Sequence, residues 1–275
     1  MFQTGLVIAH FHKEGKLRSD TIAMLECLVP VFDRIVLVST CLNDSERKKL
    51  PASVYLHVRP NTGYDFYSYR YGIKQLQALG GRWQITVMNT SFIVQQPKLL
   101  TSHYFEKYLP SEQFDVLGLT QSFEVQAHLQ SYLLTFSSQC TQQTAFIEWW
   151  DQMTPINERY AVVYRYELGL SAMLQRCGMA LTCAMPTPAI PANNPSHFYY
   201  KELLQQFGIV KIELLKSNPF ELDLSGLTKA LGHDAGFAEL VGEGLDGDIR
   251  HLAADDRLGR KLQDLELMPA AGAKP

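Results

Sequence analysis

The sequence lacks any apolar run long enough to cross a membrane. A spanning helix needs roughly 20 consecutive apolar residues, and no stretch of the chain approaches that length. The start, Met1 to Thr4, also lacks the basic residues and following apolar segment that mark a secretory signal. We therefore expect a cytoplasmic protein, either free or bound peripherally at the inner face of the cell membrane.

An excess of charge of one sign is absent as well. The 25 Lys and Arg residues oppose 28 Asp and Glu residues, which leaves a formal net charge of -3. Proteins that bind nucleic acid broadly usually carry clustered basic charge, so we expect no nucleic-acid partner. With 46% apolar and 19% charged residues, the 275-residue chain is typical of a folded protein with a sizeable core.

Paired cysteines and glycine-rich phosphate loops are also missing. The five cysteines are scattered, and no two stand at the spacing of a zinc knuckle or a redox pair. His10 and His12 stand two apart, but a metal site would need a third ligand that the spacing does not identify. The absence of a Gly-rich phosphate loop counts against an unrelated nucleotide-binding enzyme.

The first third of the chain alternates short apolar runs with amphipathic segments. Strands are predicted for residues 5–9, 34–39, 54–58 and 84–89, the first of them buried on both faces and the second also buried. Helices are predicted for residues 19–28, 43–50 and 66–79. This β-α-β order predicts an α/β fold, a Rossmann-type domain with a mainly parallel central sheet and helices on both faces.

The rest of the chain is less regular. Further strands are predicted for residues 115–120, 131–136 and 210–215, and further helices for residues 143–153, 166–178 and 197–207. The proline-rich segment 185–195 is expected to be irregular, because proline interrupts both helices and strands. After about residue 224 the chain becomes rich in Gly, Ala and Asp. We therefore expect one domain over residues 1–225 and a C-terminal appendage or linker over 226–275.

Polar residues gather where ligands bind in such a sheet. Open α/β sheets bind ligands outside the carboxyl ends of their strands. The candidate binding residues at these ends are His10, Asn61, Gly63, Asp65, Asn89 and Ser91. The segment from Arg59 to Asp65, before a helix and a strand that ends in a polar triplet, resembles the nucleotide-sugar site of GT-A glycosyltransferases.

The triplet Asn89-Thr90-Ser91 bears on metal binding. GT-A enzymes place an acidic DxD motif after this strand, where a divalent cation neutralises the leaving diphosphate. The triplet contains no carboxylate, so we do not expect it to hold Mg²⁺ or Mn²⁺ alone. No cofactor is predicted with certainty. Hydrogen bonding to a ligand and capping of the next helix are both open as its role.

Glu167 is the candidate general base, because it begins the predicted helix 166–178. Many inverting GT-A enzymes carry an acid at such a position, where it removes the proton of the acceptor hydroxyl. The alternative is that Glu167 only stabilises the helix dipole. His128 is a second catalytic candidate and Gln130 a candidate acceptor-binding residue, since both precede an alternating strand; a structural role is equally open for His128.

The motifs, taken in chain order, resemble the rhamnan synthesis protein F family, glycosyltransferases of bacterial cell-surface polysaccharide assembly. The similar pieces are Ala9-His10-Phe11, Asp33-Arg34-Ile35-Val36, the segment from Arg59 to Phe66, Gly118-Leu119-Thr120, His128-Leu129-Gln130-Ser131-Tyr132, the segment from Tyr166 to Ser171, Asn194-Pro195-Ser196-His197, Glu213-Leu214-Leu215 and Asn218-Pro219. His197 is thereby a further candidate for acceptor binding. The departure lies at residues 89–91, where the family pattern reads Asn-Asp-Ser.

The resemblance implies a GT-A-like domain with its donor half over about residues 5–91 and its acceptor half over about 92–225. The implied donor is a nucleotide diphosphate sugar, with rhamnose as one candidate. The implied acceptor is a glycan or lipid-linked glycan such as O-antigen or rhamnan, and other subunits of a polysaccharide synthesis complex are possible partners. The alternative hypothesis is a non-catalytic GT-A-like module that binds glycan or a partner enzyme, since the acidic residue is missing.

Overall fold

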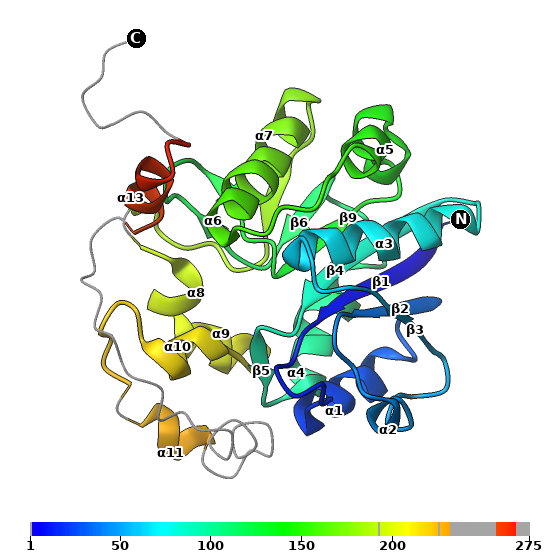
Figure 1. Ribbon diagram of the computed structural model, residues 1–275, viewed down its shortest axis with the longest axis horizontal. Coiled ribbons are helices and arrows are strands. Elements are labelled where there is room, and N and C mark those ends of the chain that lie inside the picture. Colours follow the sequence, from blue (N-terminus) through cyan, green and yellow to red (C-terminus); the bar gives the residue numbers. More distant parts are fainter. Residues whose placement is uncertain (1, 192, 225, 232–256, 268–275) are drawn as a thin grey trace.

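The computed structural model describes residues 2–191, 193–224, 226–231 and 257–267, and its centre is a seven-stranded sheet (Figure 1). The sheet consists of β1 (Gln3–His10), β2 (Arg34–Ser39), β3 (Val54–Val58), β4 (Trp83–Asn89), β6 (Val116–Gly118), β9 (Leu133–Phe136) and β10 (Leu181–Cys183). The strand order is β10-β6-β9-β4-β1-β2-β3.

Most neighbours in this sheet are parallel. β1 runs parallel to β2 and β4, β2 runs parallel to β3, and β6 runs parallel to β10. In contrast, β9 is antiparallel to both of its neighbours, β4 and β6. The mainly parallel sheet predicted for the first half is confirmed, and the chain forms an α/β domain.

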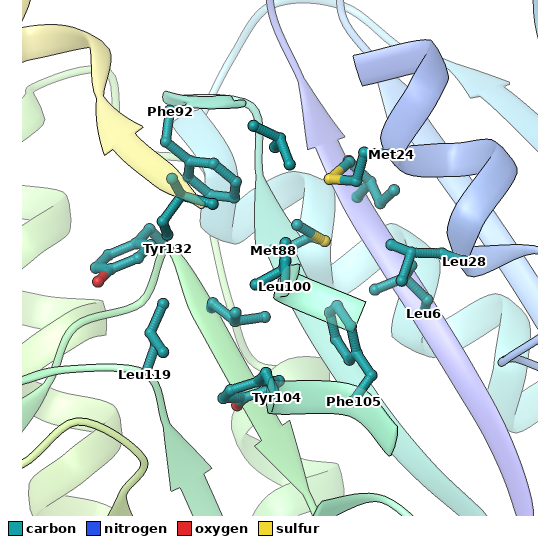
Figure 2. Packing of buried hydrophobic residues seen from close by; sticks show 14 of the residues in the cluster. Leu6, Met24, Leu28, Met88, Phe92, Leu100, Tyr104, Phe105, Leu119 and Tyr132 are labelled. Atoms are coloured by element: carbon teal, nitrogen blue, oxygen red, sulfur yellow. The ribbon is translucent and has the colours of Figure 1, made fainter. Parts of the chain in front are cut away.

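Helices cover both faces of the sheet, because the inner strands are apolar on both sides. Leu6 and Ile8 of β1 belong to one core, whereas Val7 and Ala9 belong to the other. The first core packs against α1 (Ser19–Leu28), α4 (Pro97–Leu100) and the π-helical turn η1 (Thr101–Glu106). Figure 2 shows part of it, with Met24 and Leu28 packed near Leu6.

The second core packs against α3 (Tyr64–Ala78), α5 (Thr144–Asp151) and α7 (Gly169–Arg176), which lie on the opposite side of the sheet from α1 and α4 (Figure 1). The remaining short elements are α2 (Asp44–Arg47), β7 (Gln121–Ser122), β8 (His128–Leu129) and the 3-10 turn η2 (Cys140–Gln142). None of the described helices is long and apolar enough to span a bilayer.

A small body beyond the main sheet contributes to the site. It comprises β5 (Phe92–Val94), α8 (Pro195–Phe198), α9 (Tyr200–Phe207), β11 (Ile209–Lys211) and α10 (Ile212–Ser217). β11 pairs antiparallel with β5, which places Lys211 opposite Phe92. Past the boundary predicted at residue 225, α11 (Leu227–Leu231) packs on this body and α13 (Arg257–Asp264) packs through Leu262 on Leu168.

Several predicted elements differ from the structure. The helix predicted to begin at residue 166 begins at Arg159, because the carboxylate of Glu158 accepts hydrogen bonds from the first free backbone amides. The helical run then passes through α6 (Arg159–Val162) and the π-helical η3 (Val163–Leu168) into α7. Glu167 therefore lies inside the run and not in its first turn.

The strand predicted for residues 210–215 ends at Lys211, and the helix predicted for residues 197–207 is split at Tyr199. β11 can pair only as far as the three-residue strand β5 extends. From Ile212 the chain turns into α10, whose Leu214 is buried against Ile93. Local periodicity did not reveal the length of the partner strand, so the strand was predicted too long.

Candidate functional site

A buried arginine organises the loop before α3. Arg59 follows β3, and its guanidinium donates two hydrogen bonds to Oγ of Ser68 on α3. It also donates to the backbone carbonyls of Pro60, Thr62 and Tyr64. The rigid fork of donors fixes the path of the loop. The motif from Arg59 to Asp65 therefore forms one ordered loop that places Asp65 in the first turn of α3.

Gly63 is required in this loop by its conformation and by its surroundings. Its φ is +73°, and an added Cβ would lie 2.7 Å from Cβ of Tyr67 and 3.1 Å from Cα of Pro155. Gly63→Ala should lower the free energy of unfolding by about 1–3 kcal/mol, measured by denaturant titration. Gly80→Ala is the matched control, because Gly80 has φ +72° and open space around it. Equal losses for the two variants would refute the packing argument.

A continuous chain of hydrogen bonds joins α3, β4 and β11. Nδ2 of Asn89 donates to Oδ2 of Asp65 over 2.7 Å. Oδ1 of Asn89 accepts from the backbone amide of Ser91 over 3.1 Å and from its hydroxyl over 2.6 Å. The hydroxyl of Ser91 in turn accepts from Nζ of Lys211 over 2.6 Å. Asn89 and Ser91 thus connect the carboxyl group of Asp65 to the ammonium group of Lys211 at the carboxyl end of β4.

Lys211 lies in an acidic and partly apolar environment. The Lys211 residue is partly exposed, and its ammonium group stands 4.4 Å from the ring centroid of Tyr132. Burial lowers the pKa of Lys211 to about 8, against the opposing effect of the carboxylates of Glu213, Asp65 and Glu167. Burial likewise raises the pKa of Asp65, against its hydrogen bond from Asn89 and the charge of Lys211.

Glu167 is held by Ser131 and His128. Its Oε2 accepts from the backbone amide of Ser131 over 2.8 Å and from the Ser131 hydroxyl. Its Oε1 lies 3.6 Å from Nε2 of His128. Burial alone would raise the pKa of Glu167, but His128 and Ser131 outweigh burial and lower it. The carboxylate is therefore ionised at neutral pH.

His128 is oriented for this contact by its other ring nitrogen. Nδ1 lies 2.8 Å from the carbonyl oxygen of Gln126, which can only accept, so Nδ1 carries a proton. Burial would lower the pKa of His128, but the carboxylate of Glu167 outweighs burial and raises it. The side chain of His128 is only 2% exposed, and that of Glu167 is 16% exposed. Glu167 is the member of the pair that reaches solvent.

An exposed ion pair borders the site. Nη2 of Arg159 donates to both carboxylate oxygens of Glu213, over 3.1 and 3.0 Å. Oε2 of Glu213 also lies 3.9 Å from Nε2 of His197. We refer to Asp65, Asn89, Ser91, Arg159, Glu167, Lys211 and Glu213 together as the β4-end cluster.

The predicted donor-binding residues fall into two groups. Asp65, Asn89 and Ser91 come together in the β4-end cluster. Gly63 shapes the loop that carries Asp65, and Asn61 is exposed in that loop. His10 instead joins the ends of β1 and β2: Nδ1 lies 2.9 Å from Oγ of Ser39 and Nε2 lies 3.0 Å from the carbonyl oxygen of Lys16. Burial lowers the pKa of His10 to about 4, so its ring is neutral.

The predicted acceptor-binding residues are buried. Gln130 accepts a hydrogen bond from the hydroxyl of Thr120 over 2.8 Å and donates to Oδ1 of Asn194 over 3.1 Å. His197 is 3% exposed and packs against Phe220 at 5.4 Å between ring centroids. Both residues hold the segment around α8 in place, and direct contact with an acceptor remains a prediction.

The donor set at the β4 end does not suit a divalent cation. Mg²⁺ and Mn²⁺ prefer several carboxylate, carbonyl or water oxygens around one point. Within the described ranges no group of three or more His, Cys, Asp or Glu side chains is close enough to hold a metal ion. Oδ2 of Asp65 already accepts a hydrogen bond from Asn89, and the hydroxyl oxygen of Ser91 already accepts one from the ammonium group of Lys211.

Lys211 and Arg159 were not predicted as functional residues. Lys211 lay inside a predicted strand, and Arg159 lay before the predicted start of its helix. Glu213 belonged to a family-like piece but had no assigned role. The available signal was the pair of charged residues, Lys211 and Glu213, that interrupts an otherwise apolar run at residues 209–215.

Comparison with protein families gives one match. The family model described as rhamnan synthesis protein F matches residues 35–230, well over half of the chain. This range contains every residue of the β4-end cluster, from Asp65 to Glu213. A search of curated proteins found no match.

Several solved structures resemble the chain weakly. One is a mannose-1-phosphate geranyltransferase from Thermus thermophilus, 10% identical over 56% of this chain and 66% of that chain, with a TM-score of 0.39. Another is the bifunctional IspDF from Campylobacter jejuni, 13% identical over 75% of this chain and 55% of that chain, also with a TM-score of 0.39. A third is a 4-diphosphocytidyl-2C-methyl-D-erythritol synthase from Anaerococcus prevotii, 10% identical over 74% and 96%, with a TM-score of 0.39.

Proposed function

The chain belongs to the rhamnan synthesis protein F family, and on this basis we propose that it is a glycosyltransferase of bacterial cell-surface polysaccharide synthesis. The donor is a nucleotide diphosphate sugar, and rhamnose, the constituent of rhamnan, is the first sugar to test. The acceptor is a growing glycan or lipid-linked glycan such as rhamnan or O-antigen. We place this reaction in the cytoplasm or at the inner face of the membrane.

The observation that carries the proposal is the β4-end cluster. It combines an ionised carboxylate, Glu167, with hydrogen-bonding groups and an ammonium group at the carboxyl end of a parallel strand. Ligands of open α/β sheets bind at such ends. The family membership supports this class of reaction, and the cluster offers a candidate base and a candidate cation for it.

In the proposed reaction the acceptor hydroxyl attacks the anomeric carbon of the donor sugar. A new carbon–oxygen bond forms, and the bond to the diphosphate breaks with its electron pair leaving on the diphosphate. Glu167 takes the proton of the hydroxyl. Ser131 fixes one carboxylate oxygen of Glu167, and His128 faces the other, so the base is oriented before the acceptor arrives.

Asp65 is assigned to the nucleotide, where its carboxylate accepts hydrogen bonds from the ribose or the base. Asp65→Ala is expected to weaken donor binding about 10- to 100-fold, the effect of losing a hydrogen bond to a charged group. Calorimetry with dTDP-, GDP- and UDP-sugars measures this. Glu26→Ala, which removes an exposed carboxylate from α1, should bind as the wild type does. A variant that unfolds would show that Asp65 is chiefly a structural partner of Asn89.

The same panel separates the enzyme from a non-catalytic module. Binding of one nucleotide sugar together with slow hydrolysis supports the glycosyltransferase. Binding of glycan without any nucleotide sugar would support a module that recognises glycan or a partner enzyme of a polysaccharide synthesis complex. The panel is run with and without Mn²⁺, so that a metal requirement does not hide activity.

A further inference from the structure

A positively charged side chain, that of Lys211, lies at the carboxyl end of β4. The ammonium group of Lys211 donates to the hydroxyl of Ser91 over 2.6 Å, at the last position of the triplet that follows β4. It also lies against the ring of Tyr132, 4.4 Å from the ring centroid. The antiparallel pairing of β11 with β5 sets this position, since it places Lys211 opposite Phe92, the neighbour of Ser91.

This ammonium group lies at the carboxyl end of β4, the edge at which open α/β sheets bind their ligands. A nucleoside diphosphate gains negative charge as its bond to the sugar breaks, and a site without a cation would oppose its departure. The nearby carboxylates of Asp65, Glu167 and Glu213 make a cation still more necessary, because they repel the diphosphate. The described residues around this point include no set of ligands for a metal ion.

We propose that Lys211 is a catalytic residue that binds the diphosphate of the donor and neutralises it as it leaves, so that transfer needs no divalent cation. This inference rests on the proposed glycosyltransferase function. The ammonium group donates hydrogen bonds to phosphate oxygens and stays protonated. The acceptor proton goes to Glu167, and the electron pair of the broken bond goes to the diphosphate.

The surroundings of Lys211 keep its side chain in position without filling its hydrogen-bonding capacity. An ammonium group has three donors, of which one is directed to Ser91. The Lys211 residue as a whole is partly exposed. Glu213 lies two residues further on and is turned toward Arg159, which donates to both of its carboxylate oxygens. The donors of Lys211 that Ser91 does not take are the ones that the proposal assigns to the phosphate oxygens.

The pH dependence supplies a second readout. The charged groups that act on Lys211 are Asp65 of α3, Glu167 of η3, Glu213 of α10 and Arg159 of α6. Burial lowers the pKa of Lys211 to about 8 against the pull of the three carboxylates. The cation is lost as the pH rises through this value, so kcat/KM should fall above about pH 8. Lys211→Arg should move this fall to higher pH, because a guanidinium remains charged.

The direct test uses inorganic pyrophosphate as the probe, in EDTA, with binding measured by calorimetry. The wild-type chain should bind it, and Lys211→Gln should bind it at least about 10-fold more weakly, as expected for a lost charged hydrogen bond. Lys216→Gln is the control, since it removes the same charge from the exposed side of α10. Equal binding by Lys211→Gln and the wild type, or no binding by the wild type, would overturn the proposal.

Measuring sugar transfer distinguishes failure of the role proposed for Lys211 from failure of the proposed glycosyltransferase function. Once a donor is known, wild-type transfer should persist in EDTA, and Lys211→Gln should reduce kcat about 100-fold or more, the usual effect of removing a donor that stabilises developing charge. Wild-type transfer that EDTA abolishes and Mn²⁺ restores would overturn the role of Lys211 but leave the glycosyltransferase intact. Absence of transfer from every donor, with and without Mn²⁺, would instead reject the glycosyltransferase.

Folding of the variants is checked by thermal melting. If Lys211→Gln does not fold, Lys211→Arg carries the test, because it keeps the charge and the contact with Tyr132. The proposal is supported if Lys211→Arg still binds pyrophosphate and the fall of its kcat/KM at high pH moves to a higher pH. A fall of kcat/KM at the same pH in Lys211→Arg as in the wild type would overturn it.

Discussion

Glu167→Gln is expected to lower the rate of sugar transfer by about 100- to 10,000-fold, the range for loss of a general base. The amide keeps the shape of the side chain and can still accept a hydrogen bond from the amide of Ser131, but it cannot take a proton. Donor affinity should change little, because Glu167 is assigned to the acceptor hydroxyl. Turnover and donor binding are measured on the same preparation.

In the structure, a catalytic role of Glu167 can be distinguished from a role in stabilising the helix dipole. Glu167 lies inside a helical run that begins at Arg159, so a helix-dipole effect of a first-turn acid is not expected. Glu148→Gln, an exposed substitution on α5, is the matched control. Transfer by Glu167→Gln at the wild-type rate would remove Glu167 from the mechanism and make His128 the next residue to test.

Arg18→Met should destabilise the protein by about 3–5 kcal/mol, the usual cost of removing one partner of a buried ion pair. Nε and Nη2 of Arg18 donate to the two carboxylate oxygens of Asp20 over 2.8 and 3.0 Å. Nη1 and Nη2 also donate to the carbonyl oxygens of Thr90 and Phe92. The side chains of Arg18 and Asp20 are 6% and 1% exposed, so the methionine would leave an unpaired buried carboxylate.

Denaturant titration measures this loss, and a second variant tests its cause. Asp20→Asn in the Arg18→Met background removes the uncompensated charge while Asn can still accept the hydrogen bond from the amide of Val94. The double variant should therefore be more stable than Arg18→Met alone. A loss below about 1 kcal/mol for Arg18→Met, the range of surface ion pairs, would contradict a structural role at the β4 end.

The sequence predicted the limits of several helices and strands in the first third of the chain. The helix at residues 19–28 and the strands at residues 34–39 and 54–58 have the predicted limits. The strand at residues 34–39 is buried along almost its whole length, whereas Tyr55 and Val58 of the strand at residues 54–58 are exposed. The motif at residues 59–65 also pointed to a real unit. Its cause is Arg59, the first residue of the motif, whose guanidinium donates to carbonyl oxygens within the motif and to Ser68 on α3; the sequence does not show that this side chain is buried.

The cation of the candidate site could not be predicted in the same way. Lys211 meets Ser91 across 120 positions of sequence only because β11 pairs with β5. The same pairing is short, and for that reason the predicted strand at residues 210–215 was too long. Periodicity reports which face of an element is buried, but not which distant element covers it or where that pairing stops.

The most direct test of the central claim is mass spectrometry of a glycan acceptor incubated with the wild-type chain and a panel of dTDP-, GDP- and UDP-sugars. We expect one donor of the panel to give an acceptor that is one sugar longer, with release of one nucleoside diphosphate per sugar added. An unchanged acceptor and intact donors across the whole panel, with and without Mn²⁺, would contradict the assignment of the β4-end cluster to sugar transfer.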